Sequence, residues 1–157
     1  MHFEKTAWTD ENFEEMGWHD CKIYAMSFNS ERFELIFDID YILQSVDPEK
    51  DNANYSFWIS PATLIFGNVY DINMNIYSTD LEILDISKGN SAIPKNVNHI
   101  DTLIEYDWTI ETSTGEITFK SIGYRQVMRK PPKLYDRQSI GLLERGGVSF
   151  EEVFKDS

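Results

Sequence analysis

Residues 32–43, RFELIFDIDYIL, place apolar side chains at every second position. One parity holds Phe33, Leu35, Phe37, Ile39, Tyr41 and Leu43, and the other holds Glu34, Ile36, Asp38, Asp40 and Ile42. Because successive side chains of a strand point to opposite faces, this period of two predicts a long β-strand with an apolar face and an acidic face. A strand of this length needs neighbouring strands to satisfy its backbone hydrogen bonds, so the chain is expected to form a β-sheet.

Shorter segments with strand-like character surround this strand. Residues 20–29, DCKIYAMSFN, precede it, and the NSE loop at 29–31 predicts that the two form an antiparallel hairpin. The STG turn at 113–115 predicts a second hairpin within residues 102–124. Further strands are predicted at 55–60, 61–69 (after Pro61), 70–77 and 81–87, with polar loops at 45–54 and 88–101.

Helical patterns are confined to the two ends of the chain. Residues 9–17, TDENFEEMG, predict a short helix that Thr9 or Asp10 caps and Gly17 ends, and the tail after Pro132 predicts another short helix and a Gly-Gly turn. No long helix separates the strands, which disfavours βαβ units. We therefore expect one all-β domain over residues 1–157, mainly antiparallel, as a sandwich or open barrel with a short helix near each end.

The charge is strongly acidic and unevenly spread. The chain has a net charge of −13, and residues 1–60 hold thirteen acidic residues against four basic ones. Residues 120–157 reverse the balance, with eight basic residues against five acidic ones. Within them, the basic stretch YRQVMRKPPK at 124–133 could pair with the acidic half or bind an anion. Arg125 and Arg129 share a face of an extended segment. The overall charge disfavours nucleic-acid binding and favours a basic protein partner.

The location of the protein is predicted from its cysteine content and its N-terminus. A single cysteine forms no internal disulfide, which is typical of a reducing compartment. The N-terminus is too acidic for a signal peptide, and no apolar run approaches the ~20 residues of a membrane span. We expect a cytoplasmic protein without a membrane partner.

Four reactive residue types follow one another at Trp18, His19, Asp20 and Cys21. On a regular strand, His19 and Cys21 would lie about 7 Å apart, too far for a hydrogen bond, and Asp20 would point to the opposite face. Cys21 shares its parity with Ile23, which predicts a small buried side chain rather than a nucleophile. The favoured interpretation is a structural junction in which the His19 ring contacts a backbone carbonyl or Asp20.

No motif predicts a metal, a cofactor or a catalytic residue. The histidines stand at positions 2, 19 and 99, without metal-binding spacing, although His19, His99 and a distant carboxylate could together ligate a metal. Glu34, Asp38 and Asp40 could act as acids or bases, hold a cation, or bind a protein. The simplest interpretation is the wet side of a strand, although Ile36 and Ile42 on the same face indicate partial burial.

Some segments resemble known protein families. The Trp18-His19-Asp20 triplet before an acidic strand resembles small bacterial proteins with a W-H-D signature, some of which are immunity proteins of polymorphic toxin systems. FDIDYIL (37–43), SPATLIF (60–66) and GEITFKSIGYRQVMR (115–129) are similar to segments of an uncharacterised bacterial family with a mostly-β domain. These resemblances imply a β-rich protein but no catalytic residue.

Two functional hypotheses follow. The first is a non-enzymatic binding protein, such as an immunity-type inhibitor of a basic toxin. The second is a β domain that binds a small ligand or a metal, with possible hydrolytic activity, through His19 and nearby carboxylates. An exposed edge strand would also allow a homodimer. The candidate binding residues are Trp18, His19, Asp20, Glu34, Asp38, Asp40 and Trp58.

Overall fold

Ten strands and two short 3-10 helices form the chain in a computed structural model, which describes residues 3–50 and 54–156. The elements are β1 (Ala7–Thr9), η1 (Asp10–Glu15), β2 (Lys22–Asn29), β3 (Glu34–Val46), β4 (Ser56–Gly67), β5 (Tyr70–Ile76), β6 (Leu81–Ala92), η2 (Val97–His99), β7 (Glu105–Thr112), β8 (Gly115–Ser121), β9 (Gly123–Met128) and β10 (Lys133–Tyr135). The strand pairs are antiparallel. The predicted all-β, mainly antiparallel fold is confirmed.

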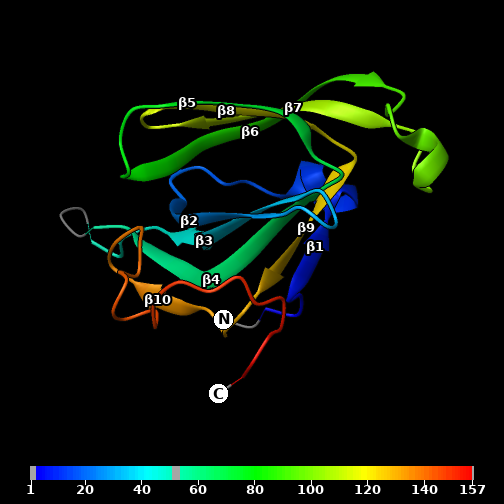
Figure 1. Cartoon of the computed structure of the whole chain (residues 1–157). Coiled ribbons are helices and arrows are strands. Elements are labelled where there is room, and N and C mark those ends of the chain that lie inside the picture. The colour runs from blue at the N-terminus through cyan, green and yellow to red at the C-terminus, as the bar shows by residue number, and fades with distance from the viewer. Residues whose placement is uncertain (1–2, 51–53, 157) are drawn as a thin grey trace.

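The strands form one open sheet that folds over on itself. Its order is β1-β9-β4-β3-β2-β6-β7-β8-β5, and β10 pairs separately with β4. The pairing of β2 with β6 joins a lower layer of β2, β3, β4 and β9 to an upper layer of β5, β6, β7 and β8 (Figure 1). Aromatic side chains fill the space between them: the Phe66 ring of β4 lies 5.2 Å from Trp108 of β7 and 4.7 Å from Phe119 of β8, centroid to centroid.

The long strand forms as its alternation predicts. In β3, the apolar parity faces the core, where Leu35, Phe37, Ile39 and Tyr41 are buried. Strand β2 pairs with β3 in the predicted antiparallel hairpin. Phe33 differs from the prediction: it lies in the turn with φ of 55° and is 59% exposed, because the hairpin turn places it in the left-handed region outside the ladder.

Residues 56–67 form one continuous strand, β4, rather than two strands separated by Pro61. Pro61 lies where β4 changes its neighbour, because β9 pairs with residues 62–67 and β10 with residues 57–59. A proline has no N–H to donate, so it is tolerated where one side of the strand lacks a regular partner. Its carbonyl oxygen still accepts a hydrogen bond from the Arg129 N–H at 2.9 Å.

The helix predictions have different outcomes. The N-terminal helix is present as η1, where the Thr9 hydroxyl and the Asn12 side chain form a reciprocal capping box. The prediction of a C-terminal helix is wrong, because residues 142–146 form only a single turn. This turn is bounded by Gly141 and Gly147, which have φ of 101° and 87°. Left-handed glycines on both sides limit the helical conformation to this turn. No helix in the described residues has the length and apolar character to span a membrane.

The two predicted polar loops are both shorter in the structure, because the flanking strands extend into them. The predicted loop at 88–101 is shorter, because β6 continues to Ala92. The predicted loop at 45–54 lies between the end of β3 at Val46 and the start of β4 at Ser56. Positions 51–53 of this loop lie outside the described residues, and so does His2.

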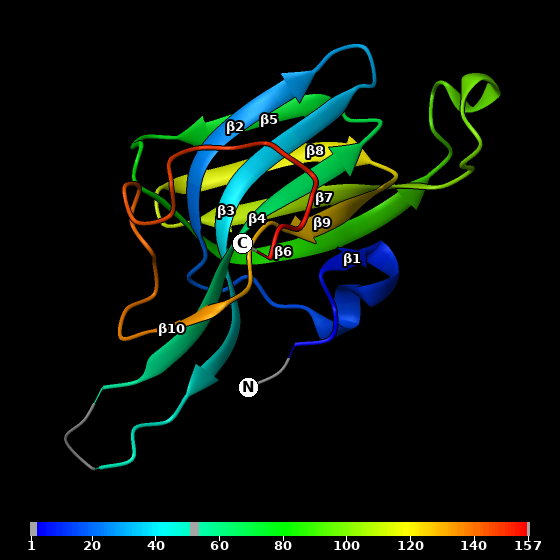
Figure 2. The ribbon, with the colours of Figure 1, turned by 90° about the horizontal axis from the view of Figure 1, so that it is seen from below.

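The last part of the chain crosses the outer face of the lower layer. In Figure 2, this segment, residues 136–156 and hereafter the C-terminal strap, runs over β2, β3 and β4. The Thr63 hydroxyl of β4 donates to the Glu151 carbonyl at 2.6 Å, and the Ser149 N–H donates to Asp38 of β3 at 2.9 Å. The strap therefore covers the lower layer, whereas the outer face of the upper layer is uncovered in Figure 1.

Candidate functional site

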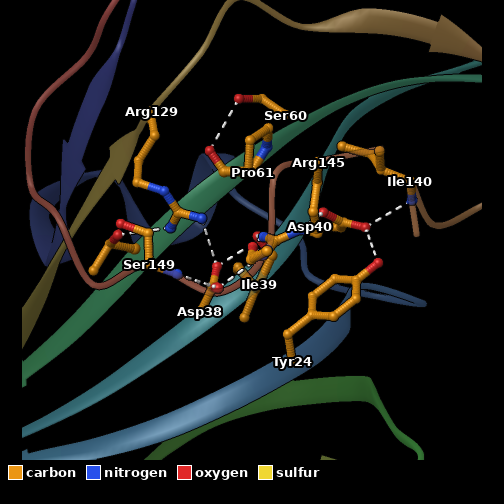
Figure 3. A network of polar contacts seen from close by, with 12 residues as sticks. Tyr24, Asp38, Ile39, Asp40, Ser60, Pro61, Arg129, Ile140, Arg145 and Ser149 are labelled. Carbon is orange, nitrogen blue, oxygen red and sulfur yellow. Dashed lines mark hydrogen bonds and ion pairs between the residues drawn. The ribbon is translucent and has the colours of Figure 1, made fainter. Parts of the chain in front are cut away.

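A buried network of ion pairs lies between β3 and the C-terminal strap (Figure 3). The Arg145 guanidinium donates to both oxygens of Asp38 at 2.7 and 2.8 Å and to Asp40 at 3.0 Å. It also donates to the carbonyls of Ile39 at 3.1 Å and Gly147 at 2.7 Å. These five bonds equal the full donor inventory of an arginine side chain. Arg145 is therefore the residue that ties the strap to the sheet.

Other donors in the same network also bind the two aspartates. Asp38 also accepts from Arg129 at 2.7 Å, and Asp40 accepts from the Tyr24 hydroxyl at 2.6 Å. Burial alone would lower the pKa of Arg145, but its hydrogen bonds and charge contacts with Asp38 and Asp40 raise it overall, so the guanidinium stays positive. Burial, followed by the hydrogen bond to Asp40, raises the pKa of Tyr24. The network is built to hold charge pairs together rather than to exchange a proton.

The interpretation of Glu34, Asp38 and Asp40 as the wet side of a strand is wrong, whereas their assignment as binding residues stays a prediction. All three carboxylates are buried in the structure. Arg125 lies 2.9 Å from Glu34 and, through Nε, 2.7 Å from Glu152 of the strap. The prediction that the basic stretch 124–133 pairs with the acidic half is confirmed by Arg125 with Glu34 and Arg129 with Asp38. Arg145, which lies outside that stretch, is a further counter-ion that the sequence did not indicate.

The Trp18-to-Cys21 stretch forms a turn rather than a strand. The Cys21 N–H donates to the Trp18 carbonyl at 3.0 Å, and Asp20 has φ of 69°. This turn brings His19 Nδ1 to 3.4 Å from Asp20 Oδ1, so the prediction that Asp20 points away from His19 is wrong. The other Asp20 oxygen accepts from Gln138 of the strap at 2.8 Å. The His19 side chain is 72% exposed.

The two tryptophans among the candidates each pack against another aromatic ring. Trp18 is buried, and its indole N–H donates to Gln126 at 2.8 Å. Trp58 is half-buried on β4, with its ring 5.7 Å from that of Phe3. Within residues 3–50 and 54–156, no three His, Cys, Asp or Glu side chains assemble as a metal site, and His19 lies on the surface apart from the buried Asp38 and Asp40.

Cys21 is a core residue, as its parity predicts. Its side chain is fully buried, and its sulfur accepts a hydrogen bond from the Ile42 N–H at 3.4 Å. Burial raises the pKa of the thiol to about 12, so the neutral form predominates at physiological pH.

We expect Cys21 to resist alkylation in the native protein. Iodoacetamide at pH 8 reacts with the thiolate, which is both rare and inaccessible here. Intact-mass spectrometry should show no adduct in buffer and one adduct in 8 M urea. Rapid native labelling would contradict the burial of Cys21.

Three carboxylates form a row across the outer face of the upper layer. Asp85 of β6 lies opposite Glu111 of β7, which lies opposite Glu116 of β8. All three residues are exposed, and none forms an ion pair with a Lys, Arg or His side chain in the described part of the chain. We call Asp85, Glu111 and Glu116 the acidic row. Like charges directly opposite each other on neighbouring strands destabilise a sheet, so the acidic row opposes folding.

The neighbouring residue rows on this face are neutral or have their charges paired. The next row along the strands is neutral and consists of Ser87, Thr109, Thr118 and Asn73. Beyond it, Lys120 neutralises Asp107 at 2.7 Å. The unneutralised charge is therefore concentrated at one end of the upper layer. The predicted hairpin at 102–124 already brings Glu111 and Glu116 close, but the sequence does not show that β6 pairs with β7 and adds Asp85 to them.

Comparison of the chain with protein-family models, with curated proteins and with solved structures finds no match in any of the three. The resemblance of the Trp18-His19-Asp20 triplet to immunity proteins, and that of the longer segments to a mostly-β family, therefore stay predictions.

Proposed function

We propose that this protein is a non-catalytic binding protein that recognises a basic protein through the outer face of its upper layer. The observation that carries this proposal is the acidic row, in which Glu111 lies between Asp85 and Glu116 without a counter-ion among the described side chains. Positive side chains of a partner would remove this repulsion on binding. Residues that lower stability in the free protein are typical of functional surfaces.

Charge elsewhere in the molecule supports the same proposal. The strap and β9 neutralise the acids of the lower layer, yet the protein retains a net charge of −13. Such a field accelerates association with a basic partner and makes the association rate fall as salt is added. A toxin with a phosphate-binding surface would have the complementary charge, so an immunity-type inhibitor acting in the cytoplasm is the specific form of this proposal.

The interior gives no support to the alternative hydrolytic hypothesis. Asp38 and Asp40 are held by Arg129 and Arg145, and the Cys21 thiol is buried and neutral. A general acid needs a proton-donating atom, and a general base a proton-accepting atom, that a substrate can reach. These buried groups lack that access.

Neutralising the acidic row tests the proposal. The triple variant Asp85→Asn/Glu111→Gln/Glu116→Gln should bind a fluorescent octalysine peptide about tenfold more weakly at low salt, a difference of about 1.4 kcal/mol. The same variant should unfold at higher urea, with a gain of about 0.5–2 kcal/mol, because two like-charge pairs across strands disappear. Fluorescence anisotropy and urea titration measure the two effects.

A matched control separates the acidic row from total charge. The variant Glu11→Gln/Glu14→Gln/Glu15→Gln changes the net charge equally, at three exposed residues of η1. It should weaken peptide binding less than threefold, since it leaves the upper layer intact. Equal weakening by both triple variants would mean that binding follows net charge alone, and would overturn the proposed site.

A further inference from the structure

Strand β5 is a free edge of the sheet. It ends the strand order and pairs only with β8, and residues 71–75 are exposed. The N–H and C=O groups on its other side have no strand partner among the described residues. Its sequence from residue 72 to 76, INMNI, has none of the lysines or prolines that commonly protect an edge strand.

The two faces of β5 continue the two faces of the upper layer. Met74 lies opposite the buried Ile117, so it extends the apolar face, yet it remains 36% exposed at the edge. On the outer face, Asn75 lies opposite Glu116 and ends the line of the acidic row with a neutral side chain. An added strand would thus meet an apolar margin on one face and neutral amide side chains on the other, with Glu116 one strand further in.

The edge is also held in place before any partner arrives. A Cβ at Gly115 would lie 1.9 Å from the Asn75 carbonyl oxygen, and Gly115 has φ of 138°. Only glycine allows this close approach of the β7–β8 turn to β5. The Tyr77 N–H donates to the Thr114 carbonyl at 3.2 Å and fixes the end of the strand. A positioned edge loses little conformational entropy when it pairs.

We propose that β5 pairs with an extended segment of the basic partner, which joins the sheet as an additional strand. This inference rests on the proposed function and specifies how the partner binds. The segment would alternate, with apolar side chains beside Met74 and Ile76 and Lys or Arg beside Asn73 and Asn75. Strands lie about 4.8 Å apart, so a basic side chain beside Asn75 starts about 10 Å from the Glu116 strand, a span that the two long side chains bridge together.

A second copy of this chain fits the same edge less well. Its β5 would present Asn73 and Asn75, not basic side chains, and it would bring a second acidic row into the same sheet. Each copy also adds a net charge of −13. Charge complementarity therefore favours a basic segment over the homodimer that an edge strand could otherwise form.

Three peptides of equal charge test the proposal on the full chain. The first is alternating (VKVKVKV), the second is the same peptide with its backbone amides N-methylated, and the third is the block peptide KKKVVVV. The alternating peptide should bind about tenfold more tightly than the other two in fluorescence anisotropy. It alone should slow hydrogen exchange of amides in residues 70–76.

Two variants with matched exposure locate the contact. Met74→Thr should weaken binding of the alternating peptide about fivefold, because it removes the apolar margin of the edge. Leu84→Thr changes a residue of β6 that is 37% exposed and should leave that binding unchanged.

The outcomes distinguish this inference from the proposed function. If all three peptides bind equally and neutralising the acidic row weakens all of them, the β5 proposal is overturned while the proposed function stands. If no peptide binds, both are overturned. If the free chain is a dimer by light scattering, with residues 70–76 already protected from exchange, a second copy occupies the edge and the β5 proposal is overturned.

Discussion

Replacing Arg145 with alanine is expected to lower the free energy of unfolding by about 3–5 kcal/mol, the range for breaking a buried ion pair from one side. Arg129 would still neutralise Asp38, but Asp40 would be left buried without a cation. The guanidinium also lies 4.0 Å above the centroid of the Tyr24 ring, and the variant would lose this contact. Urea denaturation followed by tryptophan fluorescence measures the loss.

The chain supplies a matched control for Arg145 eight residues earlier. Arg137 pairs with Asp136 and Glu144, but all three side chains are substantially exposed. Arg137→Ala should therefore cost less than about 1 kcal/mol. Arg145→Lys should recover only part of the lost stability, since an ammonium group has three donors where the site presents acceptors for five. Equal effects of Arg145→Ala and Arg137→Ala would show that the buried network does not anchor the strap.

Replacing Phe66 with alanine should cost about 3–5 kcal/mol, as is usual for a buried phenylalanine. Phe66 is fully buried on β4, and its ring contacts Phe37 of its own layer and Trp108 and Phe119 of the upper layer. The cavity would open where the two layers meet, and rigid rings on both sides would fill it poorly.

Phe28→Ala is the matched control for this prediction, because Phe28 lies at the end of β2 and is 61% exposed. Its loss should change stability by less than about 0.5 kcal/mol. Urea titration of both variants at equal protein concentration compares them directly. A small effect of Phe66→Ala would indicate that the layers are held together mainly by the β2–β6 pairing.

The two outer faces of the molecule differ in how their charge is balanced. On the lower face, Arg125, Arg129 and Arg145 neutralise the acids of β3, and the strap excludes water. On the upper face, the acidic row has no such partners in the described residues. Arg125, Arg129 and Arg145 pair on the lower face and Lys120 pairs with Asp107, so the acidic row keeps the charge with which a basic partner would interact.

Local sequence patterns were sufficient for much of the fold. The period of two across residues 33–43 predicted β3 and its core side chains, and the loop at 29–31 predicted its hairpin with β2. The Thr9 cap predicted η1, and the parity of Cys21 predicted its burial. These features depend on neighbours within a few residues, where alternation, capping and turn chemistry act.

The buried ion-pair network and the acidic row are formed by long-range contacts that local sequence patterns do not encode. By itself, the sequence determined that β3 has an acidic face, but only the tertiary structure decided that Arg145, 107 residues after Asp38, covers that face and buries it. In the same way, Asp85 joins Glu111 and Glu116, which lie on one predicted hairpin, only through the pairing of β6 with β7. Alternation predicts which residues share a face of one strand, whereas the burial or exposure of that face depends on which distant segment packs on it.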